Sequence, residues 1–421
     1  MSRRKYILLL FGLVMLSLVV LYPMLFLPRV EVVRDKGTPA EEPMEQEMYR
    51  SMVYKELNVT VSMSSLELLE LERFSRVFQQ EYPGLFVNIQ NIPYQEAYET
   101  LKTAARIGES PDVMLLDTTW VHDFAAHGLL KPADAVYTGE TLSDHLQGLL
   151  QPLKWNGYIW GVPKDADPLV IVWNSKLLRD AGMEAPPATW SEFVRVTGQL
   201  ADMEAGGAPA TNWVNLDPDD ARQWMVWLSS LEKTATDPMA PGPIGGDRLE
   251  RIGFMDLNAS RVSELSLNYE SNQLKAAMEK GTVLSAVVTW SVASSMDGVV
   301  VLGGESAEQP LWINGRSFVI SSATEMEEDA RMWINYITEV DRQKIFYEHF
   351  RKLPTRVSLY GRLTPDTPPD WLRQRLEAEP ESSPDPEWLQ QFLFYESLWK
   401  QWREGALAQD LFIEEWNKEA S

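Results

Sequence analysis

The sequence predicts an α/β fold divided into two lobes, and three observations support that prediction. The chain has 421 residues, of which 45% are hydrophobic and 24% charged, so it is globular but longer than one compact core usually accommodates. Strand and helix patterns alternate along it, as they do in βαβ units. Residues 113–116 are apolar on both faces, which is expected of a strand buried inside a parallel sheet.

The first elements of this alternation lie after residue 56. Residues 57–63 show the β-branched alternation of a strand, and residues 86–89 form a second short strand after a Pro-Gly turn. A helix is predicted between them because apolar residues recur at helical spacing. These residues are Leu71, Phe74, Val77 and Phe78.

Two helix starts are predicted from capping boxes, in which a Thr is followed three residues later by a Glu. The pairs are Thr189 with Glu192, and Thr324 with Glu327. Each pair precedes an apolar run at helical spacing, so both are predicted to be structural.

Polar and aromatic residues follow the buried strand directly. Asp117 and Trp120 flank two threonines, either of which can cap the next helix, and Gly128 ends that helix. In open α/β sheets, ligands bind beyond the carboxyl ends of the strands. Asp117 and Trp120 are therefore candidates to face a ligand cleft; the alternative is that Asp117 only caps and Trp120 packs between lobes.

Charge and cysteine content exclude several kinds of partner and site. The net charge of -23 argues against nucleic acid and against anionic lipid surfaces. The chain has no cysteine, which excludes disulfides, thiolate metal sites, thiol nucleophiles and lipid attachment through a cysteine.

The N-terminus predicts a membrane anchor. A basic cluster at residues 3–5 precedes an uncharged run over residues 6–27, which is about long enough to span a bilayer. We predict an uncleaved single-pass helix at residues 6–28, with a removed secretory signal as the alternative. The basic cluster would stay in the cytoplasm, which places the rest outside. Residues 29–56 are polar and Glu-rich and are predicted to be a tether.

Six segments occur in an order that carries a family resemblance. They are LERFSRVFQQEYPGLFVNI, GESPDVMLLDTTWVHDFAAHGLLKPAD, WNGYIWGVPKDADPLVIVWNSKLLRDAGMEAPPATWSEF, AAMEKGTVLSAVVTW, GRSFVISSATEMEEDARMWINYI and LPTR. In this order they resemble the extracellular solute-binding proteins of ABC transporters, and more narrowly the maltose- and oligosaccharide-binding group. The resemblance covers nearly the whole predicted extracytoplasmic chain.

The resemblance implies a periplasmic-binding-protein-like fold of two lobes joined by three crossings. The first lobe would contain residues 57–171 and 315–352, and the second residues 172–314 and 353–421. Hinge closure on a small solute is the expected mechanism. The expected partners are the solute, the permease of an ABC transporter and the membrane that holds the N-terminal helix, with the protein acting as a monomer.

Six further residues are candidates for the cleft. Asp165 and Asp167 lie in a short polar loop, and ionised carboxylates accept strong hydrogen bonds from sugar hydroxyls; the alternative is that both are solvated loop charges. For Trp290 the resemblance implies an aromatic ring that stacks on a sugar, with a place in the core as the alternative. The remaining candidates are Trp213 and Trp224, for which packing is the alternative, and Arg356, as a ligand donor or a cross-lobe ion pair.

Three departures from the family pattern stand out. The lipid-bearing cysteine is absent, and the predicted membrane helix would replace it. Residues 314–316 lack the usual paired glycines, which bears on the second crossing. Residues 236–258 match no family segment and are predicted to be a surface loop.

Two other function classes are the alternatives to a transport protein. A sensor subunit, which presents bound solute to a membrane kinase or receptor, would also carry an anchor and a tether. A glycoside hydrolase needs two carboxyl groups across one bond, but the chain carries no nucleophile elbow, metalloprotease, Walker or Rossmann motif. We therefore predict no enzyme activity, no cofactor and no metal site. The acidic and aromatic candidates favour a neutral hydroxylated ligand, with sugar alcohol, sugar phosphate, polyamine and peptide left open.

Overall fold

The computed structural model describes residues 55–217, 220–231, 239, 242–265, 267–268, 271–301, 311–363, 367–378 and 387–420. The chain divides into two units, residues 1–53 and 54–421, and the following description concerns the second. The predicted anchor at residues 6–28 lies outside the described residues, as does the predicted tether except for Lys55 and Glu56, which begin β1. None of the helices in the described part combines the length and apolar character needed to cross a membrane.

The first of two sheets contains six strands in the order β2-β1-β3-β15-β4, with β7 also paired to β15. Its strands are β1 (Lys55–Val61), β2 (Leu85–Asn91), β3 (Val113–Asp117), β4 (Leu130–Lys131), β7 (Val162–Ala166) and β15 (Gly315–Ser321). β1 pairs in parallel with β2 and β3, while β15 runs antiparallel to its neighbours. The three strands predicted from the first part of the sequence are confirmed, with bounds that differ by a few residues.

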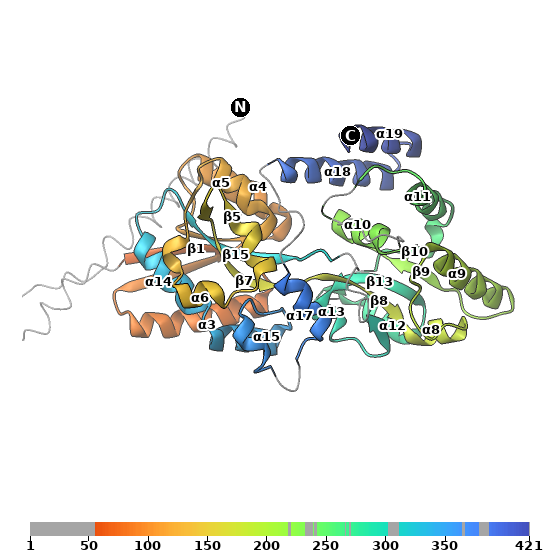
Figure 1. The fold of residues 1–421 in the computed structure, drawn as a ribbon, viewed down its shortest axis with the longest axis horizontal. Coiled ribbons are helices and arrows are strands. Elements are labelled where there is room, and N and C mark those ends of the chain that lie inside the picture. Colours follow the sequence, from red (N-terminus) through yellow and green to blue (C-terminus); the bar gives the residue numbers. More distant parts are fainter. Residues whose placement is uncertain are drawn as a thin grey trace, which may run out of the picture. The chain divides into compact units, whose positions relative to one another are not determined.

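Helices cover this sheet, as Figure 1 shows in the left part of the view. They are α3 (Ser65–Glu81), α4 (Tyr94–Arg106), α5 (Val121–Ala126), α6 (Gly139–Ser143), α7 (Gln147–Leu150), α14 (Glu327–Ile337) and α15 (Val340–Phe350), with the short 3-10 helices Thr118–Trp120, Asp134–Val136 and Gln151–Leu153 and the hairpin of β5 (Lys154–Trp155) and β6 (Tyr158–Ile159). α3 begins at a capping box in which Ser64 and Glu67 bond each other's backbone N–H. It buries Leu71, Phe74 and Phe78 as predicted, whereas Val77 is 37% exposed.

The second sheet has five strands in the order β10-β9-β13-β8-β14. They are β8 (Leu169–Asn174), β9 (Asn212–Asn215), β10 (Val262–Ser263), β13 (Val283–Thr289) and β14 (Val299–Val301), accompanied by the small hairpin of β11 (Leu267–Asn268) and β12 (Ser271–Asn272). β13 lies at the centre, parallel to β9 and antiparallel to β8. β8 and β13 are buried almost throughout, which explains their uninterrupted apolar sequences.

The helices of the second sheet lie in the right part of Figure 1. They are α8 (Ser175–Asp180), α9 (Trp190–Ala205), α10 (Ala221–Ser230), α11 (Asp247–Leu257), α12 (Gln273–Lys280), α13 (Trp290–Ala293), α18 (Trp388–Arg403) and α19 (Gln409–Glu419), with a 3-10 turn at Ala259–Arg261. α18 and α19 pack on α10 through aromatic rings; the Trp224 and Trp399 ring centroids are 4.3 Å apart. Two short helices, α16 (Val357–Tyr360) and α17 (Asp370–Glu377), precede α18.

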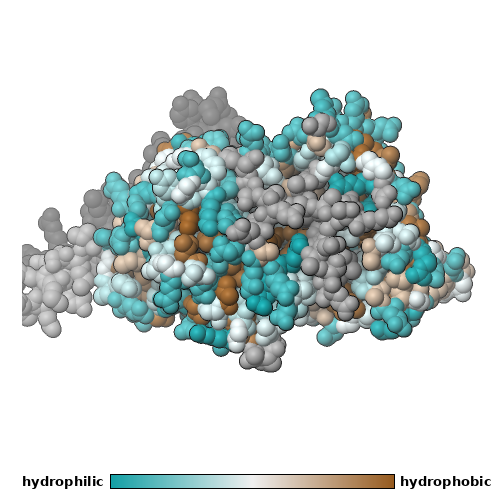
Figure 2. All heavy atoms as spheres, in the orientation of Figure 1, coloured by the Kyte–Doolittle hydropathy of each residue, from teal (hydrophilic) through white to brown (hydrophobic). Residues whose placement is uncertain are grey.

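The prediction of a surface loop over residues 236–258 is wrong for its second half. That half forms helix α11, in which Ile252 and Met255 are buried in the core of the second sheet. Figure 2 shows that polar side chains predominate on the face of the molecule drawn there, with apolar side chains visible in patches between them.

The chain passes from one sheet to the other at segments that bond to each other. β7 ends at Ala166 and β8 begins at Leu169, so the change of sheet falls at residues 167–168. The predicted boundary between residues 171 and 172 lies inside β8, all of which belongs to the second sheet. The return passage runs alongside the first, since the Leu169 N–H donates to the Trp312 carbonyl at 3.0 Å. Leu353, after α15, exchanges hydrogen bonds of 2.7 and 3.0 Å with Ala166.

Candidate ligand-binding cleft

A cleft of about 1130 Å³ lies between the two sheets. The first sheet contributes the residues that follow β1, β2 and β3, together with the start of α3 and the segment after α15. The second contributes the start of α10 and residues of α12 and α13, and the crossings contribute Asp167 and Asn314. Because β1, β2 and β3 are parallel neighbours, their carboxyl ends meet at one edge, where ligands bind in open α/β sheets.

One side of the cleft is aromatic. The rings of Tyr94 and Trp120 are stacked, with centroids 5.5 Å apart and planes inclined by 25°. The Asp117 carboxylate lies beside them and accepts hydrogen bonds from Thr119 Oγ1 at 2.7 Å, from the Thr119 N–H at 3.0 Å and from Tyr94 Oη at 3.2 Å. This side therefore combines a flat apolar surface with a hydrogen-bond acceptor.

A buried polar group supports Trp120 from behind. The Tyr98 ring meets Trp120 edge-on at 5.5 Å, and Tyr98 Oη donates to Asp123 at 3.0 Å. Lys102 completes the group through an ion pair of 2.8 Å with Asp123. Burial and the Asp123 charge raise the pKa of Tyr98 above its ordinary value, so its hydroxyl keeps its proton and the ring keeps its place.

Arg222, at the start of α10, connects the two walls. It donates to both oxygens of Asp220 at 2.7 and 2.9 Å and to Tyr94 Oη at 3.1 Å. It also donates to Asn314 Oδ1 at 3.1 Å and lies 3.6 Å from an Asp117 oxygen. Burial alone would lower the pKa of Arg222, but Asp220 and the other acidic neighbours raise it well above its ordinary value. The guanidinium is thus a permanent charge that joins α10 to α4 and β3.

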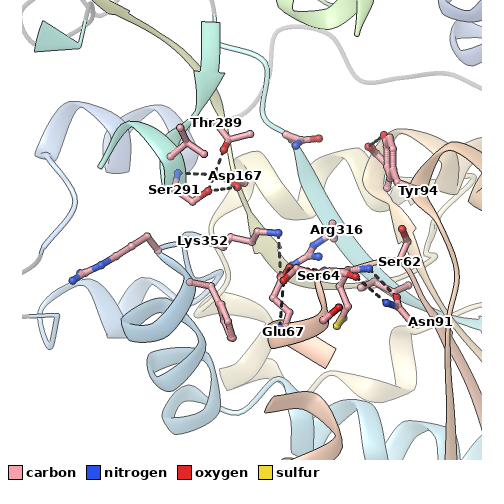
Figure 3. A pocket seen from close by; sticks show the side chains of 18 of the residues that line it. Ser62, Ser64, Glu67, Asn91, Tyr94, Asp167, Thr289, Ser291, Arg316 and Lys352 are labelled. Carbon is pink, nitrogen blue, oxygen red and sulfur yellow. Dashed lines mark hydrogen bonds and ion pairs between the residues drawn. The ribbon is translucent and has the colours of Figure 1, made fainter. Parts of the chain in front are cut away.

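A network of charges forms the floor of the cleft (Figure 3). Arg316 pairs with Asp165 at 2.5 Å and with Glu67 at 2.6 Å, and Lys352 pairs with the same Glu67 oxygen at 3.0 Å. Lys164, behind the floor, contacts Asp165 at 2.6 Å. Burial opposes ionisation of both carboxyls, but Arg316 and the lysines hold the pKa of Asp165 and of Glu67 well below their usual range. Burial lowers the pKa of Lys164 to about 8, against the attraction of Asp165.

Asp167 links the first crossing to the second sheet. Its oxygens accept hydrogen bonds from the Ser291 N–H at 2.8 Å and from Ser291 Oγ at 2.6 Å. Burial raises the pKa of Asp167, although Lys352 and the two Ser291 bonds oppose that shift. Movement of the α13 segment relative to the crossing would have to break these bonds.

Three of the eight predicted site residues, namely Asp117, Trp120 and Asp167, line the cleft. Asp165 does not line the cleft: it is 4% exposed, and its oxygens accept hydrogen bonds from Arg316 and Lys164. Arg356 is also elsewhere, since it donates to the Thr141 carbonyl at 3.0 Å and lies 7% exposed beside α6.

The other three predicted residues are tryptophans that pack in hydrophobic cores. Trp213 stacks on Phe254 at 5.5 Å and Trp224 is fully buried. Trp290 is 9% exposed and meets Trp371 edge-on at 6.4 Å. Its neighbours Thr289 and Ser291 line the cleft instead, because side chains on adjacent residues point in different directions where β13 turns into α13.

Several cleft residues were not predicted from the sequence. Tyr94 follows the carboxyl end of β2, so the argument that identified Asp117 could have found it. Arg222, Arg316 and Lys352 carry no local signal, since each reaches the cleft through the order of strands and helices. Within the described ranges, no group of three or more acidic or histidine side chains is placed to hold a metal ion.

The structure resembles several solved sugar-binding proteins in fold. Maltose-bound MalE3 of T. maritima is 19% identical, with a TM-score of 0.68 over 87% of this chain and 98% of that one. The GacH receptor of Streptomyces glaucescens is 20% identical, with a TM-score of 0.67 over 86% and 97%. MalE of Xanthomonas citri is 19% identical, with a TM-score of 0.65 over 87% and 96%. These similarities confirm the predicted two-lobe fold.

Curated relatives match over shorter segments. A binding protein of Brucella abortus is 28% identical over 122 residues, which are 29% of this chain and 30% of that protein. The maltotriose-binding protein of Pyrococcus abyssi is 25% identical over 132 residues, or 30% of this chain and 28% of that protein. The matched segment thus spans less than a third of either relative.

The family comparison covers much more of the sequence. Residues 60–344, from β1 into α15, match the family described as bacterial extracellular solute-binding protein. With a two-lobed fold and a cleft between its sheets, the chain belongs to the bacterial extracellular solute-binding proteins.

Proposed function

We propose that the chain is a membrane-anchored extracytoplasmic protein that closes its two lobes on a sugar, in particular an oligosaccharide, and delivers it to an ABC permease. The stacked Tyr94–Trp120 pair beside the Asp117 carboxylate carries this proposal. A pyranose presents a face of C–H bonds that packs on aromatic rings, while its hydroxyls donate to carboxylates. This side of the cleft offers both partners at adjacent positions.

The size of the cleft supports a ligand larger than one sugar ring. Its volume of about 1130 Å³ slightly exceeds the roughly 300–1,000 Å³ of ordinary ligand pockets. The solved structures of similar fold include complexes with maltose, maltotriose and an acarbose homologue. Such ligands have the shape that an elongated cleft between two lobes accommodates.

The proposed closure has a hinge at the crossings. We place the lobe boundaries at residues 167–168, at residues 313–314 and after residue 352, where backbone bonds hold the passages together. A rotation about these segments changes the distance between the Trp120 wall and the α13 wall. A solute that contacts both walls favours the closed state, because it gains its second set of contacts only there.

Residues 6–28 are the proposed anchor, and the basic residues before them would remain in the cytoplasm. This arrangement keeps the cleft near a membrane partner. The same arrangement would serve a sensor, so the ligand and the membrane partner have to be identified separately.

The test is a ligand screen on the full chain in mild detergent, with unfolding followed by tryptophan fluorescence. The panel contains oligosaccharides, monosaccharides, amino acids and polyamines. A ligand at 100 times its dissociation constant should add about 2.7 kcal/mol to the free energy of unfolding. A sugar that stabilises the chain and is recovered intact supports the proposal.

Three results would contradict it. A sugar recovered in cleaved form would indicate an enzyme, and stabilisation only by amino acids or polyamines would indicate a different solute. Copurification with a membrane kinase instead of a permease would indicate the sensor role.

A further inference from the structure

The described residues that line the cleft carry more basic than acidic side chains, although the chain as a whole is acidic. The chain carries a net charge of -23. Among the described residues that line the cleft, five are basic, namely Arg222, Lys275, Arg316, Arg351 and Lys352. Only three are acidic, namely Glu67, Asp117 and Asp167. Basic side chains at the binding site of an acidic protein are expected to attract a negatively charged ligand.

Two of the basic residues have carboxylate partners of their own. Arg222 bonds to both oxygens of Asp220, and Arg316 bonds to both oxygens of Asp165. These guanidiniums hold the structure of the cleft. The question is therefore which charges balance the lysines.

Lys352 shares its carboxylate with another cation. Glu67 Oε1 accepts from Lys352 at 3.0 Å and from Arg316 at 2.6 Å, while Glu67 Oε2 bonds to Ser64. Lys164 draws on Asp165 in the same network. Three cations, Arg316, Lys352 and Lys164, thus share two carboxylates. Of these three side chains, Lys352 is the most exposed, at 22%. A partly buried cation without a full counter-charge is costly.

Asp167 lies close enough to Lys352 for the two charges to attract each other. Both its oxygens accept hydrogen bonds from Ser291, and Figure 3 shows it next to Ser291 at the start of α13, with Lys352 nearby. If Asp167 is counted as fully charged, the floor network is balanced, but Lys275 still adds a positive charge to the wall.

Lys275 adds a positive charge from the second lobe. It extends from α12, and its ammonium donates to the Ser295 backbone carbonyl at 3.0 Å, which is a neutral partner. Ser295 lies two residues after the end of α13, and Ser291 lies within α13. Lys275 and Lys352 therefore lie on the same side of the cleft, near α13, and come from different lobes. Figure 3 shows Tyr94 on a different side of the pocket from Lys352.

We infer that the solute carries an anionic group, a carboxylate or a phosphate, which binds on the Lys352 and Lys275 side of the cleft while its neutral ring stacks on Tyr94 and Trp120. The ligand class is then an acidic sugar: a uronic-acid oligosaccharide or a sugar phosphate. The inference rests on the proposed function and departs from the expectation of a neutral ligand. Charge-assisted hydrogen bonds to both lysines would also pull the lobes together, because each lysine belongs to a different lobe.

The experiment compares acidic sugars with their neutral parents. Uronic-acid oligosaccharides and sugar phosphates of gluco, galacto and manno configuration are titrated into the full chain in detergent, each beside the uncharged sugar of the same configuration. We expect the tightest ligand to be acidic and to bind at least tenfold more tightly than its parent. Raising the salt concentration should weaken the acidic ligand and leave its parent unchanged. The uronate and phosphate arms identify which anion is bound.

Two charge-removing variants and one control sharpen the test. Lys352→Gln and Lys275→Gln should each weaken the acidic ligand by about tenfold or more and leave its parent within about twofold. Lys275→Gln is informative even if Lys352→Gln disturbs the floor network, because Lys275 bonds only a backbone carbonyl among the contacts described above. Lys344→Gln is the matched control: Lys344 is an exposed lysine of α15 that pairs with Glu348 at 3.7 Å, and its loss should not change either affinity.

The outcomes separate this inference from the function on which it rests. A neutral parent that binds as tightly as its acidic counterpart overturns the inference and leaves the proposed function intact. Equal losses of both ligands in Lys275→Gln also overturn it. Absence of binding by every sugar, acidic or neutral, overturns the proposed function and this inference with it.

Discussion

Trp120 and Trp290 each follow a buried strand within three residues, yet their side chains lie in different surroundings. Trp120 is half-buried, lines the cleft and stacks on Tyr94. Trp290 is 9% exposed and packs in the hydrophobic cluster that contains Leu353 and Leu359. The first side chain is available to a ligand, whereas the second belongs to the core.

Substitution of these two tryptophans should therefore have opposite effects. Trp120→Ala is expected to weaken sugar binding by at least tenfold with little loss of stability, because the ring is only half-buried. Trp290→Ala should reduce the free energy of unfolding by about 3–5 kcal/mol, the usual cost of removing a buried aromatic side chain. Calorimetric titration and denaturant unfolding of both variants check this, and a large affinity loss in folded Trp290→Ala would contradict it.

His145 is a buried histidine that should make stability depend on pH. Burial and the nearby Arg356 charge lower its pKa to about 4, against smaller opposing effects of the Thr141 carbonyl and Asp144. The Tyr137 ring packs edge-on against it at 5.3 Å. The imidazole is thus neutral in the folded protein, with Nδ1 bonded to the Thr141 carbonyl at 2.7 Å.

The sign of the effect follows from proton uptake. In the unfolded chain the pKa is about 6.5, so between pH 6.5 and 4 the unfolded state binds a proton that the folded state does not. The free energy of unfolding should therefore decrease as pH falls through this window, by about 3 kcal/mol in total. Chemical denaturation at pH 7 and pH 5 measures the change.

The variant His145→Gln isolates the contribution of this residue. Its loss of stability between pH 7 and pH 5 should be smaller than that of the unchanged chain, since other groups remain. Identical pH profiles for His145→Gln and the unchanged chain would refute this assignment.

At the scale of elements, α7 and α17 approach each other closely at Gly148. A Cβ at this position would lie 2.7 Å from the Leu376 carbonyl oxygen and 3.0 Å from that of Ala378. Both are backbone atoms at the end of α17, so they cannot move aside as a side chain could. The glycine is required by packing, since no positive φ is involved.

Gly148→Ala should consequently reduce the free energy of unfolding by about 1–3 kcal/mol, the range for overpacking. Gly198→Ala is the matched control, because Gly198 lies inside α9 with no atom within 4 Å of its Cβ position. That change should stabilise the chain by about 0.5–1 kcal/mol through helix propensity. Denaturant unfolding of both variants gives the comparison, and equal shifts would show that α7 and α17 can separate without cost.

The two predicted capping boxes show where local signals succeed and fail. Thr189 caps α9 as predicted, since its side chain accepts from the Glu192 N–H, but the Glu192 carboxylate accepts from the Ala188 N–H, so only half of the predicted box forms. The prediction for Thr324 is wrong: its hydroxyl donates to Asp112, and α14 begins after Met326. The same hydroxyl accepts from the Met326 N–H at 2.9 Å, so Thr324 stabilises the turn before the helix, and Glu327 is the first residue of α14 instead of its third.

For the whole molecule, Arg222 is the side chain that joins the walls of the cleft. It bonds Asp220 of its own lobe, Tyr94 of the other and Asn314 at a crossing. Asp117 lies 3.6 Å away. Removal of the cation would take away the positive charge that Asp220 and Asp117 share.

Arg222→Gln should reduce the free energy of unfolding by about 2 kcal/mol, because charge-assisted bonds are lost, and should widen the distribution of distances between lobes. The chain has no cysteine, so Ile107→Cys and Leu257→Cys, at positions 64% and 86% exposed, allow spin labels in each lobe. Pulsed electron resonance then measures the distances. Arg331→Gln removes a pair within α14 alone and should leave them unchanged; an unaltered distribution in Arg222→Gln would exclude its role between the lobes.

The sequence by itself determined the α/β class, the first strands and helices, the order of segments typical of the family, and the two cleft residues Asp117 and Trp120. These follow from local patterns, because period, capping and the end of a buried strand are properties of neighbouring residues. Asp167 was a candidate from its short polar loop, and the resemblance to the family favoured it.

Only the tertiary structure decided which other side chains complete the cleft. The cleft cations are far apart in the sequence: Arg222 lies in α10, Lys275 in α12, Arg316 in β15 and Lys352 after α15. Nothing near them in sequence marks them as neighbours. The same holds for the tryptophans at 213, 224 and 290, whose burial depends on helices that pack on them from elsewhere. The physical reason is that the charge and shape of a cleft depend on which elements face each other, and that is set by strand order and packing, which local periodicity does not specify.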